Sequence, residues 1–382
     1  MGFHEFSSPY DWSRIAAYKR TAKAAFGGMI DLSVGSPVDP VPDSVRKALA
    51  VAANDPNAYG YPATAGTADL RAAIAEWFSA ARNVDLQAIH ADVVPTVGSK
   101  EGVALMASLL HFGEDDVVVQ PKVSYPTYEI GTQLAGAQVL KVDDVADVAS
   151  WRNVPGVKAV WVNSPCNPTG EVYSAERMAG IVAAVREIGA VVLSDECYAL
   201  MQWRGATNSA DDDPLQSTPC ALRSDVCAGS AEGVLVLYSL SKQSNMAGYR
   251  TAFIAGDESL IASMSAYRKQ IGQIIPGPVQ AAMAAGLRDL ESVKVQHARY
   301  RERLGVLVSA LRAYGYCTDM PDGALYVWVR AKSGDCWTDM EQLAKIGIIA
   351  SPGEFYGAPE CLRFSATASD EAIASAAERL AR

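Results

Sequence analysis

A lysine follows an apolar run near the middle of the chain, in a setting that suits covalent chemistry. Lys242 ends the segment 239–242 (Ser-Leu-Ser-Lys), which comes directly after Val-Leu-Val-Leu-Tyr, and Arg250 lies eight residues further on. A lysine amine can form an imine with an aldehyde cofactor, and Ser239, Ser241 and Arg250 could hold a phosphate. A lone lysine is most often solvated in a loop. The preceding strand, the serines and the arginine favour a cofactor site.

Two further segments carry polar residues where a strand is predicted to end. Asp195 ends the run 190–195, and Tyr198 follows three residues later. A carboxylate there could keep a heterocyclic nitrogen protonated and so make the ring an electron sink, although a turn-capping aspartate is the simpler alternative. Asn167 lies in the loop 163–170 (Asn-Ser-Pro-Cys-Asn-Pro-Thr-Gly), whose two X-Pro bonds predict a tight turn in which either bond could be cis. Asn167 could donate to a phenolic oxygen of the cofactor.

A phosphate cradle is predicted where the segment 97–102 (Val-Gly-Ser-Lys-Glu-Gly) opens a helix. Gly98 is followed by the backbone N–H groups of Ser99 and Lys100, and the first turn of a helix binds anions through such groups. Alone the motif is weak, because many helices begin this way. Open parallel sheets bind ligands at the carboxyl ends of their strands, so the four segments together indicate one site.

The elements that must position these residues alternate along most of the chain. The strand candidates are apolar along their whole length, as buried parallel strands are. Alternating strands and helices predict an α/β fold with a mainly parallel sheet sandwiched by helices. The predicted helices are 43–53, 67–82, 100–110, 175–188 and 259–271, and the predicted strands are 93–97, 116–120, 159–163, 190–195 and 234–239.

The pattern changes after a Pro/Gly joint that follows Gln273. We expect a large cofactor-binding domain over 41–275 and a smaller α+β domain over 276–382. Residues 1–40 are expected to form an arm that packs with the small domain.

Within the last third of the chain, long helices are predicted over 279–311, strands over 314–318 and 324–329, and a final helix from Asp370. The stretch 208–233 is rich in Asp, Ser and Pro, and is predicted to be a loop or surface excursion.

Together these segments resemble the class I/II aminotransferases of fold type I, which use pyridoxal phosphate, and the resemblance covers nearly the whole chain. The most specific parts are Asn-Pro-x-Gly at 167–170 and Ser-x-Ser-Lys at 239–242 with Arg250 after it. The resemblance implies that Lys242 forms the Schiff base with the cofactor and shuttles the proton at the substrate Cα. It also implies that Asp195 pairs with the pyridinium nitrogen.

The same resemblance implies roles for the other residues. Asn167 and Tyr198 would hydrogen-bond the ring hydroxyl, and Tyr125 would stack on the ring. Arg363 would bind the substrate α-carboxylate through its planar fork, and Gly35 would line the substrate side through its backbone. The phosphate would be held by Ser99, Lys100, Ser239, Ser241 and Arg250, and by Tyr61 of the partner subunit, which implies a homodimer.

Simpler interpretations of several of these residues remain open. Tyr125 and Tyr61 could be ordinary core or surface aromatics, and Arg363 could form a surface ion pair worth little. Lys100 could point to solvent and leave only its backbone and Ser99 at the phosphate.

Three segments resemble most closely the actinobacterial N-succinyl-LL-diaminopimelate aminotransferases of lysine biosynthesis. They are 31–40, 61–67 and 352–357. This likeness implies glutamate and 2-oxoglutarate as one amino couple and a second substrate with a distant carboxylate. The cations available for that carboxylate are Arg14, Lys19, Arg268 and Lys269, and the sequence selects none of them.

Composition excludes several other classes. The chain has 382 residues and a net charge of -10, which argues against a nucleic-acid surface. No apolar run reaches the roughly 18 residues of a membrane span, and no signal peptide is recognisable at the N-terminus, so we expect a cytoplasmic protein. The 7 cysteines lack Cys-x-x-Cys spacing and predict free thiols and no metal site, with Cys166 and Cys197 as packing residues.

Three competing functions are consistent with the same motifs. A pyridoxal-phosphate β-lyase that cleaves cystathionine-like thioethers can share this fold and these motifs, and so can an aromatic or broad-range aminotransferase. A non-enzymatic cofactor-binding regulator would normally carry an N-terminal DNA-binding domain. Only about forty residues, which are not strongly basic, precede the first predicted helix of the large domain.

Overall fold

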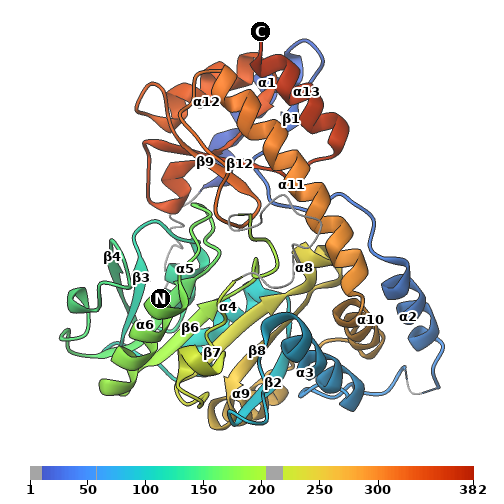
Figure 1. Ribbon diagram of the computed structural model, residues 1–382, viewed down its shortest axis with the longest axis vertical. Helices are drawn as coiled ribbons and strands as arrows, with labels where there is room; N and C mark the ends of the chain where they lie inside the picture. Colours follow the sequence, from blue (N-terminus) through green and yellow to red (C-terminus); the bar gives the residue numbers. More distant parts are fainter. Residues whose placement is uncertain (1–10, 57, 204–217) are drawn as a thin grey trace, which may run out of the picture.

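The computed structural model describes residues 11–56, 58–203 and 218–382 (Figure 1). A larger unit built around a wide sheet fills the lower part of Figure 1, and a smaller unit lies above it. The long helix α11 (Leu290–Ala313) runs from one unit to the other. Among the helices of the described ranges, none combines the length and apolarity needed to cross a bilayer.

The sheet of the larger unit has seven strands. In spatial order they are β2 (Ala91–Val97), β8 (Thr251–Asp257), β7 (Val234–Ser239), β6 (Val191–Asp195), β5 (Val157–Asn163), β3 (Val117–Pro121) and β4 (Gln138–Val142). β8 runs antiparallel to both of its neighbours, and every other neighbouring pair is parallel. The carboxyl ends of β5, β6 and β7 therefore meet along one edge of the sheet, where ligands of such sheets bind.

Helices cover both faces of this sheet, so its central strands are buried on each side. One apolar layer packs against α4 (Ser99–Leu109), α5 (Thr127–Leu134) and α9 (Glu258–Gln270). The opposite layer packs against α2 (Asp43–Ala53), α3 (Ala68–Arg82), α6 (Ala175–Glu187) and α10 (Gly277–Arg288). The prediction of an α/β fold with a mainly parallel sheet between helices is confirmed.

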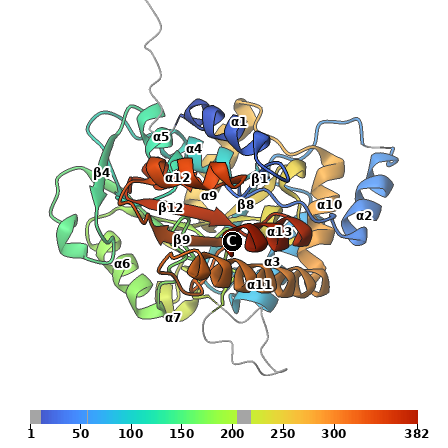
Figure 2. The ribbon, with the colours of Figure 1, turned by 90° about the horizontal axis from the view of Figure 1, so that it is seen from above.

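The smaller unit is built on a three-stranded antiparallel sheet of β11 (Ser351–Pro352), β12 (Cys361–Ser365) and β9 (Tyr326–Arg330). The helices α12 (Cys336–Lys345) and α13 (Asp370–Leu380) lie beside it, together with the upper part of α11 (Figure 2). The N-terminal segment joins this unit. β1 (Ile30–Asp31) pairs with β10 (Ile348–Ile349), and α1 (Ala16–Ala24) contacts α12. The boundaries at 40/41 and 275/276 stay predictions.

Side-chain caps explain why several helices begin where the sequence predicts. Thr67 accepts a hydrogen bond from the Leu70 N–H at the start of α3, and Ser174 accepts one from the Arg177 N–H at the start of α6. Asp289 caps α11 by accepting from the Ser292 N–H. This cap divides the predicted helical region 279–311 into α10 and α11.

The prediction of a strand over 314–318 is wrong. The N–H of Tyr316 bonds to the carbonyl of Leu311 at the end of α11, and the Nε of Arg312 donates to the carbonyl of Thr318. The helix C-terminus thus uses the backbone groups that a strand ladder would need.

Residues 208–217 of the predicted loop or surface excursion lie outside the described ranges. Residues 218–233 are mostly turns and loop, as predicted, but they are not a surface excursion. The segment 218–233 contains the short helix α7 (Ser224–Cys227), and Leu222 and Val226 belong to the apolar layer. The buried apolar side chains hold this segment against the larger unit.

Candidate active site

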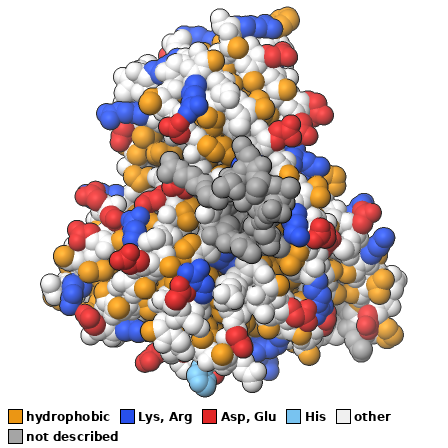
Figure 3. Space-filling view, viewed as in Figure 1, with side chains coloured by type: hydrophobic (Ala, Val, Ile, Leu, Met, Phe, Trp, Pro, Cys, Tyr) orange, Lys and Arg blue, Asp and Glu red, His pale blue; other side chains and the backbone are white. Residues whose placement is uncertain are grey.

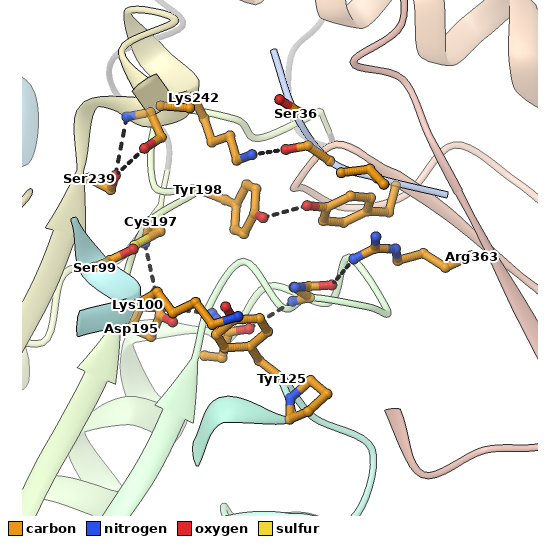
Figure 4. Close-up of a pocket in the computed structure, with 18 of the residues that line it drawn as sticks. Ser36, Ser99, Lys100, Tyr125, Asp195, Cys197, Tyr198, Ser239, Lys242 and Arg363 are labelled. Atoms are coloured by element: carbon orange, nitrogen blue, oxygen red, sulfur yellow. Dashed lines mark hydrogen bonds between the residues drawn. The ribbon is translucent and has the colours of Figure 1, made fainter. Parts of the chain in front are cut away.

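A cavity of about 430 Å³ lies where the two units and the N-terminal segment meet. Its walls include the carboxyl ends of β6 and β7, the start of α4, and side chains from β9 and β12 (Figure 4). On the coloured part of the face in Figure 3, acidic and basic side chains are interspersed and do not form one basic stripe. The predicted site residues that line the cavity are Gly35, Ser99, Lys100, Tyr125, Asn167, Asp195, Tyr198, Ser239, Ser241, Lys242, Arg250 and Arg363.

Lys242 lies on the short helix α8 (Leu240–Gln243), directly after β7. Its side chain crosses the cavity, and its Nζ donates to the backbone carbonyl of Gly35 (Figure 4). Burial lowers the pKa of Lys242, and the nearby charges of Arg363 and Arg250 lower it further. A lowered pKa raises the neutral fraction of the amine, which is the form that acts as a nucleophile and proton acceptor.

Asp195 is the last residue of β6, and its carboxylate is buried at the floor of the cavity. One oxygen accepts from the Tyr128 hydroxyl at 2.8 Å, and the other accepts from the Cys197 N–H at 3.1 Å. Burial raises the pKa of Asp195, and the hydrogen bond from Tyr128 opposes that shift. No cation pairs with this carboxylate among the described residues. A buried carboxylate with no cationic partner is suited to a protonated ring nitrogen.

Asn167 is held at the cavity by the loop between β5 and α6. The peptide bonds before Pro165 and Pro168 are both cis. The side chain of Asn163 fixes the loop, because its oxygen accepts from the Asn167 N–H at 2.7 Å and its nitrogen donates to the Asp195 carbonyl at 2.9 Å. The strand-end asparagine therefore places Asn167 beside Asp195.

Arg363 lies on β12 with 4% of its surface exposed. It donates to the side-chain oxygen of Asn167 at 2.7 Å and to the Ser33 carbonyl at 2.8 Å, and its buried Nε has no hydrogen-bond partner. The rings of Tyr326 and Tyr356 lie 4.0 Å and 4.8 Å from its guanidinium carbon. No carboxylate pairs with Arg363 among the described residues. A surface ion pair is therefore excluded there, and the fork is suited to a carboxylate ligand.

The predicted phosphate cradle is assembled from two parts of the chain. Gly98 has φ 77°, and a Cβ at that position would overlap the guanidinium of Arg250. Ser99 begins α4, and the Ser239 hydroxyl donates to that of Ser241 at 2.9 Å. Among the described residues no carboxylate pairs with Arg250. Hydroxyls, a helix N-terminus and an available guanidinium match a phosphate.

Tyr125 and Tyr61 have different surroundings. Tyr125 lines the cavity and meets Tyr128 edge-on, with ring centroids 5.7 Å apart. Tyr61 does not line the cavity and is fully exposed at 101% relative surface area. Its predicted contact with a partner subunit stays a prediction.

Several residues of the site were not found by sequence reasoning. Tyr128 holds Asp195, Tyr326 and Tyr356 flank Arg363, and Trp12 lines the cavity from the N-terminal segment. Tyr326 lay at a predicted strand and Tyr128 lay in the Tyr-Pro-Thr-Tyr segment, but no local pattern marks either one as part of this cavity.

The four cations considered for a distant carboxylate do not line the cavity. Lys19 pairs with Asp31 at 2.8 Å. The other three are engaged or turned away: Arg14 pairs with Glu354 over the Trp337 ring, Arg268 is buried against Glu101, and Lys269 is exposed on α9.

Residues beside the strand end support the site from behind. Glu196 is buried and pairs with Arg82 at 2.8 Å, so it is structural and not solvent-facing. The thiols of Cys166 and Cys197 are buried, and burial raises the pKa of both. All 7 cysteines are free, and no cluster of metal-binding side chains occurs in the described part of the chain.

Comparisons with known proteins agree with this geometry. The chain is 40% identical over 373 residues to the 4-dedimethylamino-4-oxo-anhydrotetracycline transaminase OxyQ of Streptomyces rimosus, covering 97% of this chain and 98% of the relative. It is 39% identical to the probable aminotransferase Rv1178 of Mycobacterium tuberculosis, covering 97% and 84%. The structure of a probable N-succinyldiaminopimelate aminotransferase from Thermus thermophilus superposes with a TM-score of 0.84 at 26% identity, covering 97% and 99%.

The family model for aminotransferase class I and II matches residues 27–380. The matched range contains the strand-end aspartate, the lysine of α8 and the arginine of β12. The chain therefore belongs to the aminotransferase class I and II family, whose members use pyridoxal phosphate.

Proposed function

We propose that this aminotransferase moves an amino group between an L-amino acid and a 2-oxo acid, with Lys242 as the cofactor attachment point and the proton carrier. One observation carries the proposal. A lysine with a lowered pKa faces a cavity that holds a buried carboxylate, Asp195, and a buried arginine, Arg363, and within the described ranges neither has an oppositely charged partner. These two unmatched charges are suited to a cofactor with a cationic ring, which would pair with Asp195, and to a substrate with a carboxylate, which would pair with Arg363.

Pyridoxal phosphate, when bound, supplies an aldehyde for the lysine amine and a protonated ring that accepts the electron pair of the substrate Cα. Asp195 keeps the ring nitrogen protonated, and Tyr128 and the Cys197 N–H hold that carboxylate in place. Asn167 and Tyr198 line the cavity beside Asp195 and are assigned to the ring hydroxyl.

The opposite end of the cofactor is assigned to the cradle at the start of α4. Backbone N–H groups at 99 and 100, the hydroxyls of Ser239 and Ser241, and the guanidinium of Arg250 hold the phosphate. Lys100 lines the cavity and adds a positive charge there. Tyr125 lies on the cavity wall and is assigned to the ring face.

Arg363 binds the substrate α-carboxylate in this scheme. Its fork is already oriented by Asn167 and the Ser33 carbonyl, so little side-chain entropy remains to be lost on binding. The Gly35 carbonyl accepts from the Lys242 amine in the structure, and it would hold that amine whenever it is not joined to the cofactor. With the cofactor bound, the freed amine of Lys242 would be the group that takes the proton from the substrate Cα and gives it back during the transfer.

For the substrate pair we propose N-succinyl-LL-diaminopimelate and glutamate, with 2-oxoglutarate as the acceptor. The segments 31–40, 61–67 and 352–357 support this choice, and so does the likeness to the Thermus thermophilus protein. A second candidate is a bulky cyclic ketone, which the 40% identity to OxyQ favours. The wall formed by Trp12, Val34 and Tyr356 gives such a ring apolar contacts.

A homodimer with Tyr61 reaching the phosphate of the other subunit is also part of the proposal. The exposure of Tyr61 and of the neighbouring Tyr59 supports it, because large exposed apolar side chains mark interaction surfaces. Sedimentation of the purified holoenzyme tests this point, and a monomer with full activity contradicts it.

The half-reaction tests the function directly. The holoenzyme is mixed with single amino acids, including glutamate and N-succinyl-LL-diaminopimelate, and loss of the visible cofactor band is recorded. We expect both compounds to bleach the band in the wild type and neither to do so in Lys242→Ala. Release of pyruvate and ammonia from cystathionine, without amino transfer, would instead assign a β-lyase.

A further inference from the structure

Tyr326 contacts two parts of the site that belong to different units of the fold. It lies on β9 with 2% of its surface exposed, and its phenol oxygen is 2.6 Å from that of Tyr198. Its ring lies 4.0 Å from the guanidinium carbon of Arg363. The rings of Tyr198 and Tyr326 meet edge-on, with centroids 5.6 Å apart and planes at 73° (Figure 4). One side chain therefore joins the phenol beside β6 to the arginine on β12.

We propose that Tyr326 is a positioning residue for amino transfer, which acts on the cofactor ring hydroxyl through the phenol of Tyr198. This inference rests on the proposed function, because it takes Tyr198 as the partner of that hydroxyl.

The side chain of Tyr326 packs directly against the backbone of Gly35. A Cβ at position 35 would overlap the hydroxyl and the ring of Tyr326. The carbonyl of the same Gly35 accepts the bond from Lys242. A larger residue at 35 would displace Tyr326, so the N-terminal segment and β9 are fitted to one another at the site.

The cations beside Tyr326 favour it as the donor to Tyr198. Burial raises the pKa of Tyr326, but Arg363 and Lys242 lower it more, so its pKa lies below its ordinary value. Burial raises the pKa of Tyr198 well above its ordinary value. The 2.6 Å contact allows either hydroxyl to donate. The proposal requires Tyr326 to donate to the Tyr198 oxygen, so that the Tyr198 O–H is left to donate to the ring oxygen. Successive donors in such a chain strengthen one another.

The charged and titratable groups around this pair are consistent with Tyr326 as the donor. Lys242 and Arg363 are the cations facing Tyr326, and the thiol of Cys197 is neutral because burial raises its pKa well above its ordinary value. The groups that face the pair come from α8, from the segment after β6, from β12 and from α11: Lys242, Cys197, Arg363 and Tyr300.

A pH titration of the visible cofactor band in Tyr326→Phe tests the inference. The variant keeps the ring on Arg363 and removes only the hydroxyl. When the donor to the ring oxygen weakens, that oxygen and the linked imine hold their proton more tightly. We expect the pH midpoint of the band to rise by about 0.5 to 1 pH unit, which corresponds to the free energy that one hydrogen bond typically contributes. The unfolding midpoint of each variant shows that it is folded.

Tyr316→Phe is the matched control. Tyr316 is buried in the same apolar core, and its hydroxyl donates to Asp339 at 2.8 Å, but it does not line the cavity. We expect its band to titrate as in the wild type. An equal shift in this control would mean that any loss of a buried hydroxyl in this unit moves the midpoint, and the inference would be overturned.

Tyr198→Phe shows whether Tyr326 acts through Tyr198. We expect Tyr198→Phe and the double variant Tyr198→Phe/Tyr326→Phe to titrate at the same pH, because the second substitution removes a donor whose acceptor is already gone. A wild-type midpoint in Tyr326→Phe, or a further shift in the double variant, overturns the inference. A wild-type enzyme with no visible band at all contradicts the proposed function instead.

Discussion

Replacing Arg363 by lysine tests the carboxylate site, because it keeps the charge and removes the fork. Arg363 already donates to Asn167 and to the Ser33 carbonyl, and its buried Nε is without a partner. A lysine ammonium at that position cannot keep both of these bonds and also bind a carboxylate with two parallel donors. We therefore expect the loss of one charge-assisted hydrogen bond to the substrate, about 1.5 to 3 kcal/mol.

This free energy corresponds to a fall in kcat/KM of about 10- to 150-fold. The assay is steady-state amino transfer over a range of amino-acid concentrations, together with the visible band of the holoenzyme. We expect KM to rise while the band stays unchanged, because Lys242 and Asp195 are not touched by the substitution.

Arg303→Lys is the control for this experiment. Arg303 is also buried in the smaller unit, where it pairs with Asp39 at 2.7 Å and with Asp370 at 2.6 Å, but it does not line the cavity. We expect it to lower the unfolding midpoint and leave KM unchanged. If Arg363→Lys likewise lowers stability and leaves KM unchanged, Arg363 only ties the two units together and its assignment is wrong.

Four other predictions follow from the same geometry. Asp195→Asn keeps the shape of the floor but removes its charge, and kcat should fall at least about 100-fold, measured by single-turnover bleaching of the band. Gly98→Ala adds a Cβ at positive φ that overlaps the phosphate-site guanidinium, so the cofactor Kd should rise about tenfold or more in a titration of the apoenzyme. Glu196→Gln leaves Arg82 buried without a counter-ion and should cost about 3 kcal/mol in urea unfolding. In the cofactor-free protein, the pKa of Lys242 is lower in the folded state than in the unfolded state. At pH values between these two pKa values the unfolded chain binds more protons at Lys242, so the free energy of unfolding rises with pH in that range. Lys242→Ala should remove that rise.

The placement of residues at strand ends could be predicted from the sequence because it depends on short segments. Lys242 and Asp195 each follow an apolar run, and parallel strands bring their carboxyl ends to one edge. Five of the seven strands of the large sheet were predicted for the same reason, since full burial leaves an apolar run that is easy to recognise, whereas β4, β8 and the helix α5 were not predicted. Of the three-stranded sheet around Arg363, only β9 was predicted. The strand β11 is two residues long, and β12, which carries Arg363, was not predicted.

The aromatic wall could not be predicted, because it depends on contacts between distant parts of the chain. Trp12 reaches the cavity from the N-terminal segment, and Tyr326 reaches it from β9. Neither has a local pattern that distinguishes it from a core residue. The wrong strand at 314–318 has a different cause. Its apolar residues are typical of a strand, but two of its backbone groups, at Tyr316 and Thr318, form hydrogen bonds with Leu311 and Arg312 at the end of α11.

The covalent bond at Lys242 is the central claim, and peptide mapping tests it most directly. The holoenzyme is reduced with borohydride, digested and analysed by mass spectrometry. We predict one phosphopyridoxyl group, on the peptide that contains Lys242, and none at that peptide in Lys242→Ala, which should also be inactive. A label on another lysine such as Lys100, or a Lys242→Ala protein that still transfers amino groups, would contradict the account.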